Sequence, residues 1–326
     1  MVLSGSAFDR SGGSAVSVPF PPVADAARKA AEEARERAIG HGQRGDFVAA
    51  LNCFDTALSH ARETGDEAFV DWIFVSRAAA AVEVGASESD LLELKEILLR
   101  RTDPQIALRA SSSLSVAFDL RRDTRKALFY ARIAQRHAEK LGDPAHLSAT
   151  ANHLGAILAA SSHFEEAADA FRTALELNAR EAGDSEVWRA QANDNLGYCL
   201  IALERIDEGM ELVHGALETL RKKNATGFLV YPLMDLCFGY LKQDRYTEAR
   251  FFGEAALERL ETGGPTADLA VEKNLLYLLG EACQLAGDED EAEEWFARLA
   301  RHYPGFKNLR TYLEVFDLRN VINLRT

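Results

Sequence analysis

The chain has 326 residues, with 51 acidic and 37 basic side chains and a net charge of −14 at pH 7. Because neutralising a phosphate backbone requires a basic surface, this charge argues against a general nucleic-acid binder. Hydrophobic residues make up 47% of the sequence, ample for a buried core, but no apolar run approaches the roughly 20 residues needed to cross a bilayer. We therefore expect no nucleic-acid partner and no membrane span.

Residues 1–22 are predicted to form a disordered N-terminal tail. They are rich in Ser, Gly and Pro and offer too little apolar surface to offset the entropy of ordering. They also lack the basic segment and hydrophobic segment of a secretory signal, so we expect a cytoplasmic protein. Four cysteines lie far apart without a CxxC pair, which favours reduced, buried thiols over a disulfide framework or a zinc site: Cys53, Cys199, Cys237 and Cys283.

Residues 23–304 carry a pattern of small side chains that returns every 36–43 residues. Two antiparallel helices approach closely only where side chains are short, so small residues predict where the helices of a pair cross. The pattern predicts an all-α fold of about seven antiparallel helix pairs. On the first helices the small residues are Ala38, Ala79, Ser115, Gly155, Gly197, Cys237 and Gly280. Twelve residues later, the second helices carry Ala50, Leu91, Ala127, Ala167, Gly209, Ala249 and Ala292.

Several of these pairs resemble tetratricopeptide repeats. The Leu-Gly motif of the repeat's first helix occurs at Leu154-Gly155, Leu196-Gly197 and Leu279-Gly280. The Ala-x-x-x-Phe motif of its second helix follows at Ala167–Phe171 and Ala292–Phe296. The offsets exceed the 34 residues of the standard unit, so the chain is similar to the long repeats of kinesin light chains and of bacterial peptide-sensing regulators. This resemblance implies a right-handed superhelical solenoid, and the first two pairs match it least.

Residues 305–326 are predicted to form a C-terminal cap and an apolar tail. A terminal repeat has no neighbour to cover one of its faces, and a helical stripe here can cover it: Phe306, Leu309, Leu313 and Phe316. Beyond this stripe, the apolar residues Val321, Ile322 and Leu324 either dock back on the array or serve as a contact for self-association or for a partner.

We find no motif that indicates catalysis, a metal or a cofactor. The segment Gly40–Gly45 matches GxGxxG, but a predicted helix precedes it, whereas the dinucleotide motif requires a strand. We therefore expect these glycines to end one helix and form a turn, with Asp46 capping the next helix. The eight histidines form no HExxH or comparable ligand pair. The sequence predicts a protein that is not an enzyme.

The resemblance implies a concave groove, lined by the first helices, that holds a peptide or protein ligand. Amides there could hold a peptide backbone, and aromatic side chains could form apolar pockets. Each candidate could instead pack against the adjacent repeat. Counting from the Leu-Gly landmarks, the candidates are Asn152, His153, Asp194, Asn195, Tyr198, Tyr231, Phe238, Tyr277 and Glu281.

Two functions remain open. The first is a non-catalytic scaffold or adaptor that binds a protein or peptide in the groove, and the alternative is a ligand-gated signalling regulator that senses a short peptide.

Charge is unevenly distributed along the chain. Residues 100–140 hold ten basic and four acidic side chains, whereas residues 288–294 are mainly acidic. The basic run is either a solvated helical face or a patch for an acidic partner segment.

Overall fold

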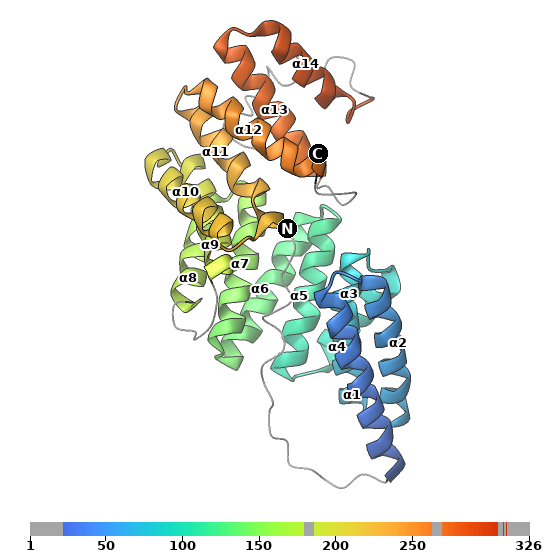
Figure 1. Cartoon of the computed structure of the whole chain (residues 1–326). Coiled ribbons are helices and arrows are strands. Elements are labelled where there is room, and N and C mark those ends of the chain that lie inside the picture. The colour runs from blue at the N-terminus through green and yellow to red at the C-terminus, as the bar shows by residue number, and fades with distance from the viewer. Residues whose placement is uncertain (1–21, 179–185, 263–268, 306–308, 310, 312–326) are drawn as a thin grey trace. The chain divides into compact units, whose positions relative to one another are not determined.

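A computed structural model describes residues 22–178, 186–262, 269–305, 309 and 311. Within these residues the regular structure is helical, with fourteen α-helices and a 3₁₀ turn at Thr226–Phe228, so the predicted all-α class is confirmed (Figure 1). The helices are α1 (Pro22–Gln43), α2 (Phe47–Glu63), α3 (Glu67–Glu83), α4 (Glu88–Arg100), α5 (Pro104–Leu120), α6 (Thr124–Leu141), α7 (Pro144–Ala160), α8 (Phe164–Asn178), α9 (Glu186–Ala202), α10 (Ile206–Lys222), α11 (Val230–Lys242), α12 (Tyr246–Thr262), α13 (Leu269–Ala286) and α14 (Glu289–Ala300).

The chain divides into two compact units, the first ending at Ile157 and the second beginning at Leu158, within α7. In the first unit α1 packs against α2, α5 packs against α6, and α3 contacts α2 and α5. In the second unit the pairs are α9 with α10, α11 with α12, and α13 with α14, and the first helices α9, α11 and α13 also contact one another in sequence. Five of the seven helix pairs predicted from the small residues are therefore present among the described residues.

Six of the described pairs share one kind of turn between their helices. Seven residues after the small residue of the first helix, the backbone has φ between 59° and 88°. The next residue donates its N–H to the carbonyl five residues earlier at 2.9–3.1 Å, as Asp123 does to Phe118. This Schellman arrangement gives hydrogen-bond donors to carbonyl groups at the helix end that have no partner within the helix, and it reverses the direction of the chain. The positive-φ residues are Gly45, Arg122, Ser162, Glu204, Asp244 and Gly287.

The α3/α4 pair departs from this pattern, and our assignment of Ala79 as its small contact residue is wrong. Ala78 is fully buried, whereas Ala79 is exposed. Gly85 has the positive φ, seven residues after Ala78, but four residues separate α3 from α4, compared with three in most other pairs. Leu91 is therefore thirteen residues from Ala78. The additional turn residue moves the register by one position, which a fixed spacing of twelve cannot reproduce.

The close approach of the helices depends on the predicted small residues. A Cβ atom added to Gly197 would lie 2.6 Å from Val213 Cγ2 and 2.8 Å from the carbonyl oxygen of Gly209. In the third pair, the Ser115 hydroxyl uses the same proximity to donate a hydrogen bond to the carbonyl of Ala127 at 2.9 Å. These contacts place the crossing points of α9 with α10 and of α5 with α6 where the sequence predicts them.

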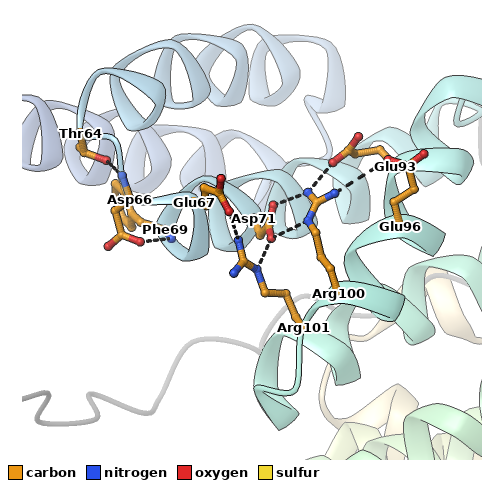
Figure 2. Close-up of polar contacts among 9 residues, drawn as sticks. All are labelled: Thr64, Asp66, Glu67, Phe69, Asp71, Glu93, Glu96, Arg100 and Arg101. Carbon is orange, nitrogen blue, oxygen red and sulfur yellow. Dashed lines mark hydrogen bonds and ion pairs between the residues drawn. The ribbon is translucent and has the colours of Figure 1, made fainter.

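An ionic cluster joins α3 to the end of α4 (Figure 2). The buried carboxylate of Asp71 accepts hydrogen bonds from Arg100 at 2.7 Å and from Arg101 at 2.5 Å. Arg100 also donates to Glu93 at 2.7 Å, and Arg101 pairs with Glu67 at 3.4 Å. Because a buried carboxylate requires charged donors, the two arginines fix the C-terminal end of α4 beside α3.

Further predictions from the sequence are confirmed at the turn between α1 and α2 and at Leu309. Asp46 caps α2 by accepting from the N–H of Ala49, and Gly40–Gly45 covers the end of α1 and its turn, as predicted. Leu309 is buried, as expected of the capping stripe. The predicted tail residues 1–21, the other stripe residues and the apolar tail lie outside the described residues: Phe306, Leu313, Phe316, Val321, Ile322 and Leu324. Of the described helices, none is long and apolar enough to cross a membrane.

Candidate ligand-binding surface

Two buried carboxyl groups lie next to each other on the first helices of the second unit. Asp194 on α9 is 4% exposed and Asp235 on α11 is 6% exposed. The Oδ1 atom of Asp194 is buried and has no hydrogen-bond partner. Burial raises the pKa of both carboxyl groups well above the ordinary value, and the charge of Asp235 raises the pKa of Asp194 further. Both groups are therefore held towards their neutral forms.

Local sequence explains how the two groups meet. Asp194 lies three residues before the small residue Gly197, and Asp235 lies two residues before Cys237. The helices that carry them, α9 and α11, are neighbours in the second unit. Burying a carboxyl group without a partner opposes folding, so the pair contributes nothing to stability that would explain its presence. Such perturbed groups are typical of functional sites.

Aromatic side chains lie one helical turn beyond the acidic pair. Tyr198 is partly exposed and follows Asp194 on the same face of α9. Its ring meets Phe164 edge-on at a centroid distance of 5.7 Å and contacts the ring of Phe238 at 6.0 Å. These contacts hold the tyrosine ring in place while part of it remains accessible. An ordered and partly exposed aromatic ring thus lies one helical turn from two buried carboxyl groups.

The predicted candidates of the second unit differ in accessibility. Asn195, Tyr231 and Glu281 are partly exposed and lie on α9, α11 and α13. Phe238 is 0% exposed and Tyr277 is 1% exposed, and both belong to the hydrophobic core of this unit. Both rings pack inside this core, so we assign Phe238 and Tyr277 to the core and not to a groove.

The two candidates on α7 belong to the first unit. His153 Nε2 lies 2.9 Å from the hydroxyl oxygen of Ser115. Since Ser115 donates its only proton to the carbonyl of Ala127, His153 must donate from Nε2 to the serine oxygen. Burial lowers the pKa of His153, which favours the neutral imidazole. His153 therefore joins α7 to α5, which is the alternative of packing against the adjacent repeat. Asn152 is partly exposed, and its buried Oδ1 atom has no hydrogen-bond partner.

Sequence reasoning missed Asp235. A signal was present, because Asp235 is the single acidic residue of the apolar helix α11.

A neighbouring thiol is also affected, since burial and then the charge of Asp235 raise the pKa of Cys199 to about 12. All four cysteines are free thiols, three of them buried. Among the described residues, no group of three or more His, Cys, Asp or Glu side chains is arranged to hold a metal ion.

Comparison with solved structures identifies the fold. NprR, solved in complex with its cognate peptide NprX, matches with a TM-score of 0.65 and 13% identity over 87% of each chain. The apo form of RapI matches with a TM-score of 0.63 and 11% identity over 83% of this chain and 96% of RapI. The chain has the tetratricopeptide-repeat fold. No protein-family model and no curated protein matches it.

Proteins with this tetratricopeptide fold can be much longer than the present chain. A signal-transduction ATPase with a tetratricopeptide-repeat sensor, from Pyrococcus horikoshii, matches with a TM-score of 0.59 and 18% identity over 90% of this chain. The chain spans only 44% of that protein's length. In tetratricopeptide terms, Asp194, Tyr198 and Asp235 lie on the first helices of the fifth and sixth repeats.

Proposed function

We propose that this chain is a non-catalytic binding protein of the cytoplasm, which holds a peptide or protein segment on the first helices of its second unit. We propose further that local opening beside the partly exposed Tyr198 lets the buried Asp194 and Asp235 receive a positively charged group of that ligand. The observation that carries the proposal is the buried Oδ1 atom of Asp194, which lacks a partner beside a second buried carboxyl group. The four free thiols are in keeping with a reducing compartment.

A cation would remove the unfavourable features of this pair. An ammonium or guanidinium group between the carboxyl groups would favour their charged forms and offer the hydrogen bonds that Asp194 lacks. The ring of Tyr198, one turn away, would cover the apolar stem of a Lys or Arg side chain. Asn195, which is partly exposed, is a neighbouring polar group that could bind the ligand backbone.

The solved structures suggest a peptide as the ligand. NprR was solved with its cognate peptide, and a Rap protein, 14% identical to this chain with a TM-score of 0.58, was solved with the competence and sporulation factor. At these identities the likeness concerns the fold, so the ligand class remains our proposal.

A peptide-gated regulator is the second candidate function. It is favoured by the same acidic pair, because a ligand that compensates two buried carboxyl groups would stabilise the second unit as well as bind to it. Any ligand that binds the folded chain raises its stability, so the kind of ligand must separate the two functions. A short free peptide that raises the unfolding temperature of the full chain favours the regulator, whereas stabilisation by larger proteins alone favours the adaptor.

The test uses two sets of labelled random decapeptides, one with a fixed central Lys and one with norleucine at the same position. We expect the wild-type chain to retain the lysine set preferentially. Asp194→Asn and Asp235→Asn should each lose this preference, because a neutral amide no longer attracts the cation. Asp169→Asn, which removes an exposed carboxylate from α8 of the same unit, is the matched control and should retain it.

Equal retention of both peptide sets by the wild-type chain would contradict a cation-binding pair. The same conclusion would follow if Asp194→Asn kept the lysine preference. Circular dichroism of each variant checks that the helices are intact.

A further inference from the structure

Two second helices, one in each unit, expose a phenylalanine on their outer face. Phe129 on α6 is 58% exposed and Phe251 on α12 is 66% exposed. Each lies two residues after the buried alanine of its helix, Ala127 or Ala249, so the two positions are equivalent in the repeat. The other described second helices carry polar residues at this position: Asn52, Glu93, Asp169, Glu211 and Glu294.

The same arrangement of rings supports both exposed phenylalanines. Phe129 meets Tyr130 edge-on at 5.1 Å, and Tyr130 stacks on Phe118 of α5 at 5.6 Å. Phe251 meets Phe252 edge-on at 5.2 Å, and Phe252 stacks on Tyr240 of α11 at 5.3 Å. The exposed rings are therefore held in fixed positions. A ring that is already ordered loses little entropy when a partner covers it.

Exposed charged residues follow each phenylalanine along its helix, and they are basic on α6 but acidic on α12. Three and seven residues after Phe129, α6 exposes Arg132 and Arg136. At the same spacing after Phe251, α12 exposes Glu254 and Glu258. Residues three and seven apart lie on one side of a helix, so each set forms a continuous stripe. We call Phe129, Arg132 and Arg136 the basic face, and Phe251, Glu254 and Glu258 the acidic face.

We propose that the basic face of one copy of this chain docks on the acidic face of a second copy. The matching spacing allows the two rings to pack while each arginine meets a glutamate. A shallow hollow of about 380 Å³ beside Phe129, lined also by Asp123, Arg125 and Lys126, leaves room for an incoming ring. The faces lie on second helices and the acidic pair on first helices, so this contact is independent of the proposed ligand-binding function.

The contact joins two different surfaces, so it is heterologous, and successive copies would form a closed ring or an open chain. A single helix-on-helix contact is smaller than the roughly 1,200–2,000 Å² of a stable interface, which predicts weak association. Opposite charges at its centre make the association sensitive to salt, because salt screens exposed charges.

Sedimentation velocity of the full chain over a range of concentrations tests the proposal. We expect the average mass to rise with protein concentration at low salt and to fall back when sodium chloride is added. A wild-type chain that remains monomeric at every concentration would overturn the proposal. The two faces would then bind a different partner or none.

Charge reversal supplies a sharper test. Arg132→Glu with Arg136→Glu, and separately Glu254→Arg with Glu258→Arg, should each weaken self-association at least tenfold. An equimolar mixture of the two double variants should associate again, because each acidic face then meets a basic one. A mixture that stays monomeric, or reversals without effect, would refute the docking.

Two further variants complete the design. Glu211→Arg with Glu218→Arg reverses two exposed charges on α10, where no exposed phenylalanine is present, and should leave association unchanged. Phe129→Ser removes the ring without changing charge and should weaken association independently of the electrostatic variants. If Phe129→Ser associates as the wild-type chain does, the ring has no part in the contact and the proposal fails.

Discussion

At the scale of single residues, the carboxyl groups of Asp194 and Asp235 link function to stability. Their pKa values in the folded chain are raised above the ordinary value of an aspartate. A raised pKa means that the folded state keeps a proton that the unfolded state has already lost. These two groups therefore destabilise the chain least below the ordinary pKa of about 4, and stability decreases as pH rises from that value through the raised ones.

Asp194→Asn should accordingly stabilise the chain at pH 8 and have little effect at pH 4. The amide carries no charge at either pH, whereas burying the aspartate is unfavourable at a pH at which its carboxyl group is otherwise ionised. Thermal unfolding at the two pH values measures the difference, and Asp169→Asn, at an exposed position, is the control. An equal effect at both pH values, or a loss of stability at pH 8, would contradict a raised pKa of Asp194.

The same residues show what the sequence can predict at this scale. Counting from Leu196-Gly197 correctly places Asp194 and Tyr198 on one side of α9, because helical periodicity fixes angular position. It gives no information on what the next repeat covers, so Phe238 and Tyr277 are counted as accessible although both are buried. Asp235 was missed for the related reason that its helix is apolar on nearly every side.

At the scale of elements, the crossing of α9 and α10 depends on the absence of a side chain at Gly197. Gly197→Ala would place a Cβ atom within 2.8 Å of the backbone oxygen of Gly209, and the backbone cannot yield as a flexible side chain can. We expect a loss of stability of about 1–3 kcal/mol, as for other overpacked cores. Urea unfolding followed by circular dichroism measures this loss.

Gly215→Ala provides the matched control. This glycine lies within α10, and a Cβ atom added there meets no atom within 4 Å. Alanine should therefore stabilise the helix by about 0.4–1 kcal/mol, because it restricts the unfolded chain. If both substitutions changed stability by the same amount and in the same direction, close packing at Gly197 would not explain the effect.

The elements were predictable to the extent that the turns are regular. Spacing of twelve residues between small positions holds for Gly197 and Gly209, where a three-residue Schellman turn joins the helices. It fails between α3 and α4, where one additional turn residue moves the contact from Ala79 to Ala78. The ionic cluster around Asp71 was also beyond the sequence, because its partners Arg100 and Arg101 are about thirty residues away.

At the scale of the whole molecule, the two units were not predicted, because the repeat pattern runs through both without interruption. Their cores differ. A cluster in the first unit is built largely from alanine, including Ala31, Ala34 and Ala57. The second unit has one extensive cluster rich in Leu, reaching from Ala190 to Leu309. Each unit thus has apolar contacts of its own, although one chain of repeats forms both.

This organisation predicts how a local defect spreads. Each repeat contacts its immediate neighbours, so the stability of a repeat array is a sum of local terms and interface terms. Strain from Gly197→Ala should increase amide hydrogen exchange in α9 to α12 of the second unit, with little change in α1 to α4 of the first. Hydrogen exchange followed by mass spectrometry resolves the helices individually, with Gly215→Ala as the control. A uniform increase from α1 to α14 would mean instead that the chain opens as one cooperative body, in which the apolar contacts of the first unit depend on those of the second.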